Sequence, residues 1–175
     1  MERLETPIER PLADLGDTRA LARALAVLLT RGDVVALGGA LGTGKTTFAR
    51  FLIEALSVHA GVPAPNEVPS PTYTLVQVYD VGPITLWHFD LYRLERPEDA
   101  LELAIEEAFN DAVTLIEWPE RLGSYLPDDR LEITFTRTID GARKAHIKGC
   151  GSRGLVLAAL LGEPGDPLLQ PGAAQ

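Results

Sequence analysis

GALGTGKT, residues 39–46, matches the phosphate-binding pattern G-x-x-x-x-G-K-S/T at every fixed position. Its glycines allow successive backbone N–H groups to point inward, where they can bind phosphate oxygens. The preceding run DVVAL, residues 33–37, is typical of a buried parallel strand, and the apolar spacing of TTFARFLIEAL, residues 46–56, predicts a helix. The pattern therefore lies between the strand and the helix that it requires, and we interpret it as a phosphate site.

Two side chains of this loop can act on the phosphates of a nucleotide. Lys45 can reach the β- and γ-phosphates, and the hydroxyl of Thr46 can ligate a magnesium ion. The predicted helix begins at Lys45 and directs the positive end of its dipole to the same place. A solvated lysine in a chance glycine loop is a poor alternative, because the chain has only two other lysines, Lys144 and Lys148.

Two carboxylates follow apolar strands and are candidates for the catalytic pair. Asp90 comes after ITLWHF, and Glu117 comes after VTLI. The carboxyl ends of parallel strands line the ligand crevice of an α/β sheet, so both side chains should face the phosphates. One would hold magnesium and the other would orient the attacking water, and the sequence leaves open which does which.

A proline-rich loop, GVPAPNEVPSP, follows the predicted helix and carries Ser70 and Thr72 at its end. Such a loop can bring a threonine to the magnesium ion or the γ-phosphate, so Ser70 and Thr72 are candidates for a switch segment. A connector stiffened by proline is the equal alternative.

The rest of the pattern predicts an α/β domain. Further helices are expected at 17–31 (capped by Asp17 or Thr18), 97–109 and 154–161, and further strands at 73–79, 84–89, 113–118, 131–136 and 142–148. The mixture of βα units and hairpins predicts three layers around a central sheet that is mostly parallel, with antiparallel additions. We expect one domain over residues 1–162 and a disordered tail over 163–175, and we interpret GCGSRG, residues 149–154, as a turn.

Composition excludes several classes of protein. The 175 residues are 46% hydrophobic and 23% charged, near the globular average, so the chain is not intrinsically disordered. The net charge of −9 argues against a stand-alone nucleic-acid binder, which needs a cationic surface. Cys150 is the only cysteine, which excludes an internal disulfide. With no secretory signal and no apolar run near the ~18 residues that span a bilayer, we expect a soluble cytoplasmic protein without membrane contact.

Four sequence blocks together resemble the TsaE (YjeE) family in order and spacing. They are GALGTGKTTFAR (39–50), SPTYTLV (70–76), HFDLYRL with the following PEDALEL (88–103), and IEWPERL (116–122). The resemblance covers roughly residues 14–160, and the HFDLYR and IEWP blocks are not general features of phosphate-binding loops. The family consists of small bacterial P-loop ATPases needed for threonylcarbamoyladenosine modification of tRNA beside the anticodon.

The resemblance implies a set of site residues. The implied ATP-binding residues are Thr18, Gly42, Thr43, Gly44, Lys45, Thr46, Thr47 and Arg143. Thr46 and Glu117 would bind Mg²⁺, Asp90 takes the Walker B-like place, and Asp90 and Glu117 together would be catalytic. Ala40 departs from the family, whose loops often have an acidic residue there, so any contact of that carboxylate is missing in this chain.

The resemblance also implies partners. The family ATPase acts with a TsaB–TsaD heterodimer, in which TsaD transfers the threonylcarbamoyl group, and hydrolysis resets the complex between turnovers. Contact with tRNA would be indirect, through the complex, which suits the negative net charge.

Other functions are open to a P-loop protein. A small-molecule kinase would need a lid with several arginines, and Arg93 and Arg96 stand among acidic residues instead. A GTPase would need the guanine-reading motif N-K-x-D, which the sequence lacks. A nucleotide-sensing module without turnover is the remaining alternative, since carboxylates can hold a metal without positioning water.

Overall fold

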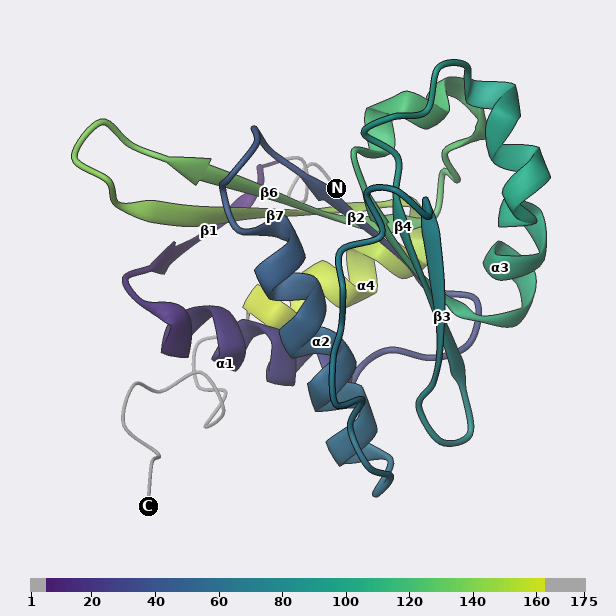
Figure 1. The fold of residues 1–175 in the computed structure, drawn as a ribbon. Coiled ribbons are helices and arrows are strands. Elements are labelled where there is room, and N and C mark those ends of the chain that lie inside the picture. The colour runs from purple at the N-terminus through teal and green to yellow at the C-terminus, as the bar shows by residue number, and fades with distance from the viewer. Residues whose placement is uncertain (1–5, 163–175) are drawn as a thin grey trace.

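A seven-stranded sheet crosses the molecule in the computed structural model, which describes residues 6–162 (Figure 1). The strands are β1 (Ile8–Leu12), β2 (Val34–Gly38), β3 (Val76–Asp80), β4 (Thr85–Asp90), β5 (Val113–Glu117), β6 (Arg130–Arg137) and β7 (Arg143–Cys150). Their order is β1-β7-β6-β2-β5-β4-β3, with parallel pairing from β6 through β2 and β5 to β4 and antiparallel pairing elsewhere. The α/β fold with a mostly parallel centre and antiparallel additions is therefore confirmed.

Helices cover both faces of this sheet. They are α1 (Leu15–Ala26), α2 (Lys45–His59), α3 (Ile105–Asp111) and α4 (Gly151–Gly162), with 3₁₀ helices η1 (Pro97–Leu103) and η2 (Pro119–Tyr125). α1, α2 and α4 share one buried cluster with the sheet, and η1, α3 and η2 share a second cluster with β2, β4 and β5. The single domain over residues 1–162 stays a prediction, and the predicted disordered tail at 163–175 lies outside the described residues.

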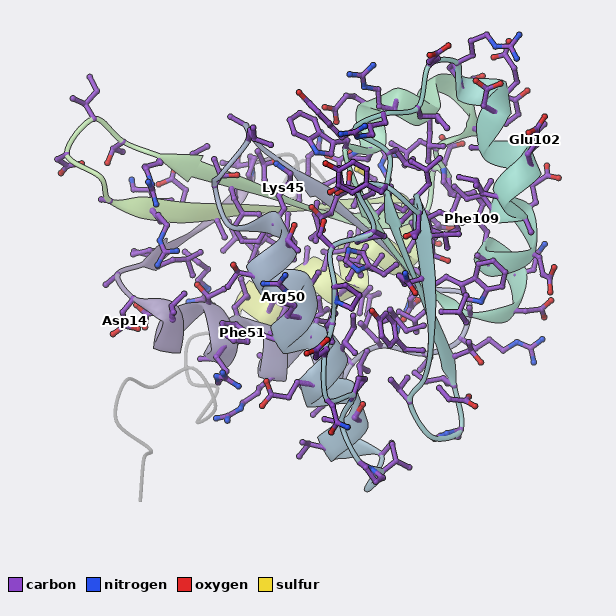
Figure 2. The ribbon with its side chains drawn as sticks, viewed as in Figure 1. Asp14, Lys45, Arg50, Phe51, Glu102 and Phe109 are labelled. Atoms are coloured by element: carbon purple, nitrogen blue, oxygen red, sulfur yellow. The ribbon has the colours of Figure 1, made fainter. Side chains whose placement is uncertain are left out.

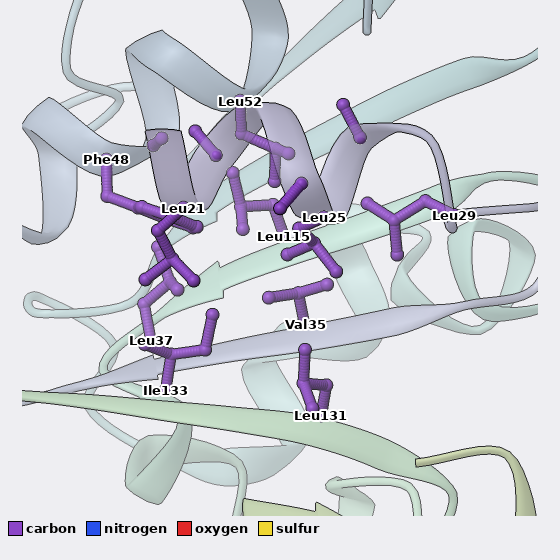
Figure 3. Close-up of a cluster of buried hydrophobic side chains, with 14 of the residues drawn as sticks. Leu21, Leu25, Leu29, Val35, Leu37, Phe48, Leu52, Leu115, Leu131 and Ile133 are labelled. Carbon is purple, nitrogen blue, oxygen red and sulfur yellow. The ribbon is translucent and has the colours of Figure 1, made fainter. Parts of the chain in front are cut away.

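The larger cluster explains the apolar run before the loop. Val35 and Leu37 of β2 pack under α1 and α2, as Figure 3 shows for Leu21 and Leu52 above them. Val34 belongs to the cluster on the opposite face, so β2 is buried on both sides. A strand with two covered faces needs apolar residues at consecutive positions, and each large buried side chain contributes about 1.5–3 kcal/mol. This packing fixes the strand that ends at the phosphate-binding pattern.

The first helix differs from its prediction at both ends. Its N-cap is Asp14, whose Oδ1 accepts a hydrogen bond of 3.0 Å from the backbone N–H of Asp17. The helix ends at Ala26 rather than at residue 31. The predicted caps, Asp17 and Thr18, both lie inside the helix, so that prediction was wrong.

The helix predicted at 97–109 is two helices. Ala104 has φ 56 and separates η1 from α3. Ala100 and Ile105 both lie in the second cluster. On a continuous α-helix these positions would be about 140° apart, so the break brings both side chains to the same buried cluster.

Two further parts of the structure, β1 and the junction of β7 with α4, differ from the sequence predictions. β1 was not predicted, because Glu9 and Pro11 interrupt its apolar pattern, but an edge strand tolerates proline. GCGSRG at 149–154 is not a turn: it ends β7 and begins α4. A Cβ at Gly149 would overlap the carbonyl of Gly154, so these glycines allow α4 to pack against the end of the strand.

Candidate active site

A cavity of about 270 Å³ lies where β2, β4 and β5 end. Its lining comes from the loop 39–46, the start of α2, both predicted carboxylates and the first residue of β7. The lining residues are Leu41, Gly42, Gly44, Lys45, Thr46, Thr47, Thr72, Asp90, Tyr92, Glu117, Trp118 and Arg143. Residues from five separate parts of the chain thus meet at the carboxyl edge of the parallel strands, where α/β folds bind ligands.

The loop before α2 needs glycine for its shape. Gly39 has φ +124, and a Cβ there would overlap the carbonyl oxygen of Phe135 and lie 2.9 Å from Thr43 Oγ1. Thr43 Oγ1 donates a hydrogen bond of 2.8 Å to the carbonyl of Ala40, which closes the loop from inside. Gly44, with φ +111, is the N-cap of α2 and offers no side chain to its first N–H groups. These N–H groups are thus left to bind oxygens of an anion in the cavity.

Lys45 is buried at the N-terminus of α2, beside this loop (Figure 2). Its Nζ donates to the carbonyls of Gly39 and Ala40 at 2.6 and 2.8 Å and lies 4.2 Å from the centre of the Trp118 ring. Burial lowers the pKa of Lys45, and the negative charge of Glu117 most strongly opposes that shift. The ammonium group of Lys45 is therefore held at the cavity by two carbonyl oxygens and the face of the Trp118 ring.

Glu117 is the last residue of β5 and is buried. Its Oε2 accepts a hydrogen bond of 2.9 Å from Thr46 Oγ1, and its Oε1 is 2.9 Å from His88 Nε2. β4 and β5 pair so that Asp90 is the direct neighbour of Glu117. The two carboxylates therefore end adjacent strands side by side.

Asp90 is joined to the loop that carries the candidate switch residues. Its Oδ2 accepts from Thr72 Oγ1 at 2.8 Å and from Ser70 Oγ at 3.4 Å, while its Oδ1 accepts from the N–H of Tyr92 at 3.1 Å. Ser70 and Thr72 are themselves 2.7 Å apart through their hydroxyls. A displacement of this loop would therefore change the hydrogen bonds of the carboxylate.

Three predicted site residues do not line the cavity. Thr43 hydrogen-bonds the carbonyl of Ala40 inside the loop. Ser70 hydrogen-bonds the lining residues Thr72 and Asp90. Thr18 is buried on α1, where its Oγ1 donates to the carbonyl of Asp14 at 3.4 Å. Its part in ATP binding stays a prediction, as do the roles of the lining residues.

Tyr92 and His88 were not predicted as site residues. Tyr92 lines the cavity and packs against Trp118, with the ring centres 5.0 Å apart. His88 lies two residues before Asp90 on β4, so strand alternation places both side chains on one face. That periodicity could have identified His88 as a neighbour of the carboxylates.

The donor set suits magnesium bound together with phosphate. Among residues 6–162, no three or more His, Cys, Asp or Glu side chains are grouped to hold a metal ion by themselves. Mg²⁺ is usually bound by one or two protein oxygens, substrate phosphates and waters, and Thr46 with Glu117 offers such a pair.

Within residues 6–162, no helix has the length and apolarity to cross a membrane.

Comparison with known proteins gives one consistent result. Residues 12–145 match the family described as "Threonylcarbamoyl adenosine biosynthesis protein TsaE". The chain is 35% identical to the tRNA threonylcarbamoyladenosine biosynthesis protein TsaE of Bacillus subtilis, over 78% of this chain and 82% of that protein. It is 38% identical to the protein of the same name in Treponema pallidum, over 75% of this chain and 93% of that protein. The crystal structure of Bacillus subtilis YdiB superposes with a TM-score of 0.74 at 28% identity, covering 92% of this chain and 97% of that one.

Proposed function

Since the chain belongs to the TsaE family of tRNA threonylcarbamoyladenosine biosynthesis proteins, we propose that it is a magnesium-dependent ATPase serving this tRNA modification. The observation that carries the proposal is the meeting of Lys45, Thr46 and two adjacent carboxylates in one cavity. These are the parts that phosphoryl transfer to water requires: a cation for the phosphates, a metal site and a group that orients water.

The hydrogen bonds suggest how the two carboxylates divide the work. Glu117 bonds the Thr46 hydroxyl, so these two side chains would hold Mg²⁺. Bound magnesium would neutralise charge that develops on the β- and γ-phosphate oxygens. Asp90 faces the candidate switch loop instead, so we assign it to accept a hydrogen bond from the attacking water and hold that water in line.

The phosphates would be bound by the loop and its lysine. The free N–H groups at the start of α2 would bind phosphate oxygens, and Lys45 would exchange its carbonyl partners for the β- and γ-phosphates. Arg143 lines the cavity beside this loop, and its Nη1 lies 4.0 Å from the position that a Cβ on Gly44 would take. Its guanidinium would add a second positive charge on the nucleotide.

In the cell we propose that the ATPase acts in the cytoplasm on a TsaB–TsaD heterodimer and supports its turnover. The family name places the chain in this tRNA modification, and a net charge of −9 suits a component that reaches tRNA only through its partners.

Two contacts weigh against a small-molecule kinase. Arg93 lies 4.2 Å from the centre of the Tyr73 ring, and Arg96 is paired with Asp99 at 2.7 Å. Neither arginine lines the cavity, so the described residues offer no arginine-rich lid. A nucleotide-sensing module differs from the proposal only in turnover.

Calorimetric titration of ATP, with and without Mg²⁺, tests the proposal. We expect ATP binding by the wild type, loss of tight binding in Lys45→Ala, and wild-type binding in the control Lys144→Ala. Lys144 is a partly exposed lysine on β7 that pairs with Glu9 and does not line the cavity. Micromolar affinity in Lys45→Ala would refute the phosphate site.

A further inference from the structure

His88 is a fully buried histidine that the proposed chemistry does not use. It lies on β4 with no exposed surface, and its Nε2 is 2.9 Å from Glu117 Oε1. Its other nitrogen, Nδ1, is buried and has no hydrogen-bond partner among residues 6–162. A histidine with one strong partner and one unpartnered nitrogen needs an explanation.

The unpartnered nitrogen identifies the tautomer. If Nδ1 carried a proton, a buried N–H donor would be unpaired, which costs more than a bare lone pair at the same place. In neutral His88 with its proton on Nε2, the only unpartnered group is the lone pair of Nδ1, and Nε2 donates to Glu117 Oε1. His88 is therefore a fixed hydrogen-bond donor to the carboxylate.

The donor constrains how Glu117 can lie. Among the described residues, only the side chains of Thr46 and His88 hydrogen-bond the Glu117 carboxylate. Oε1 is bound to His88 in the interior, which turns Oε2 to Thr46 and the cavity. Without His88 the carboxylate would be held at one oxygen and free to rotate.

We propose that His88 is a positioning residue that orients Glu117 so that Oε2 faces Thr46, with which it would hold magnesium, an inference that rests on the proposed function. His88 touches neither the cavity nor the nucleotide phosphates, because it is not among the lining residues. Partners of this kind behind a metal-binding carboxylate typically change metal affinity by 10- to 100-fold when they are lost.

Two substitutions separate the donor from the packing. His88→Leu keeps a similar apolar volume and removes the N–H, whereas His88→Gln places an amide N–H near the position of Nε2. For each we would measure the dissociation constant of ATP with and without Mg²⁺ by calorimetry. We expect His88→Leu to lose roughly 10-fold or more of the affinity gained with Mg²⁺, and His88→Gln to retain most of that gain.

The magnesium-free affinity is the control, since among the described residues His88 hydrogen-bonds Glu117 and no side chain of the loop 39–46. If His88→Leu lowered the ATP affinity equally with and without Mg²⁺, the proposal would be overturned. It would also be overturned if Mg²⁺ increased the ATP affinity of His88→Leu as much as that of the wild type. Failure of His88→Gln to restore the gain that His88→Leu loses would show that packing alone matters, which also overturns it.

A measurement without nucleotide keeps the inference separate from the proposed function. Nitrogen NMR of the imidazoles in the wild type should show one histidine with a proton on Nε2 only, and Glu117→Ala should shift that signal. The signal must disappear in His88→Gln, which assigns it. If the wild type binds no ATP, the proposed function fails, and a proton on Nδ1 or an unshifted signal in Glu117→Ala would overturn the positioning role by itself.

Discussion

Gly39→Ala tests whether the phosphate loop depends on the backbone geometry described above. The residue has φ +124, a region that side chains rarely enter, and such strain costs about 1–3 kcal/mol. The added Cβ would also overlap the carbonyl oxygen of Phe135, and a forced shift of packed backbone costs about 1–3 kcal/mol more. We therefore expect the free energy of unfolding to fall by about 4 kcal/mol, which corresponds to a Tm lower by roughly 8–16 °C.

Gly42→Ala is the matched control in the same loop. Gly42 has φ +75, and its added Cβ would have no atom within 4 Å. Only the left-handed conformation is then penalised, by about 1 kcal/mol, so Tm should fall by about 2–4 °C. Calorimetric melting of both nucleotide-free variants measures the difference. Equal losses of Tm would show that the close approach to Phe135 does not constrain the loop.

Further predictions concern stability and hydrolysis. Arg153→Ala should lower the free energy of unfolding by about 2 kcal/mol in urea titrations, because it removes a paired cation from buried Asp33, and an unchanged midpoint would refute this. Tyr79→Phe should raise stability by about 1 kcal/mol, because the Tyr79 hydroxyl is buried without a partner in the described residues, and a loss of stability would contradict it. Since burial raises the pKa of Tyr79, the folded state holds the phenol proton more tightly, and wild-type stability should fall relative to that variant as pH rises above about 10. Asp90→Asn should reduce the rate of phosphate release by about 10²–10⁴-fold with little change in ATP affinity. Thr72→Ala should reduce this rate less, because Thr72 only hydrogen-bonds Asp90. An unchanged rate in Asp90→Asn would show that Asp90 does not position the water.

The centre of the fold could be predicted from the sequence because its physical signals are local. Val34 to Leu37 form a continuous apolar run, and the glycine loop and helix that follow have their own patterns. The two strands predicted at 131–136 and 142–148 are likewise present, as the antiparallel pair β6 and β7. The residues that determine each of these elements lie close together in the sequence.

Elements that depend on distant partners could not be predicted in this way. β1 pairs with β7, more than 130 residues away, and its own residues look like a polar loop. Ala104 breaks a good helical pattern because Ala100 and Ile105 meet the same distant cluster. Long-range packing overrides local propensity at both places.

The candidate site shows the same division. Strand ends indicated Asp90 and Glu117, and the structure places them on adjacent strands in one cavity. Glu117 accepts a hydrogen bond from Thr46 of α2, and Asp90 accepts one from Thr72 of the proline-rich loop. These pairings depend on how α2 and the loop pack against the strand ends, which no local sequence pattern encodes. The alternation along β4 could have placed His88 near the carboxylates, but nothing in the sequence indicated its hydrogen bond with Glu117.

Phosphate release from ATP by the purified chain, with Mg²⁺ and with or without the TsaB–TsaD pair, tests the central claim most directly. We expect magnesium-dependent hydrolysis that rises when the pair is added and is lost in Lys45→Ala. Binding of ATP without hydrolysis in either condition would contradict it, and would leave Asp90 and Glu117 as ligands of a nucleotide-sensing module.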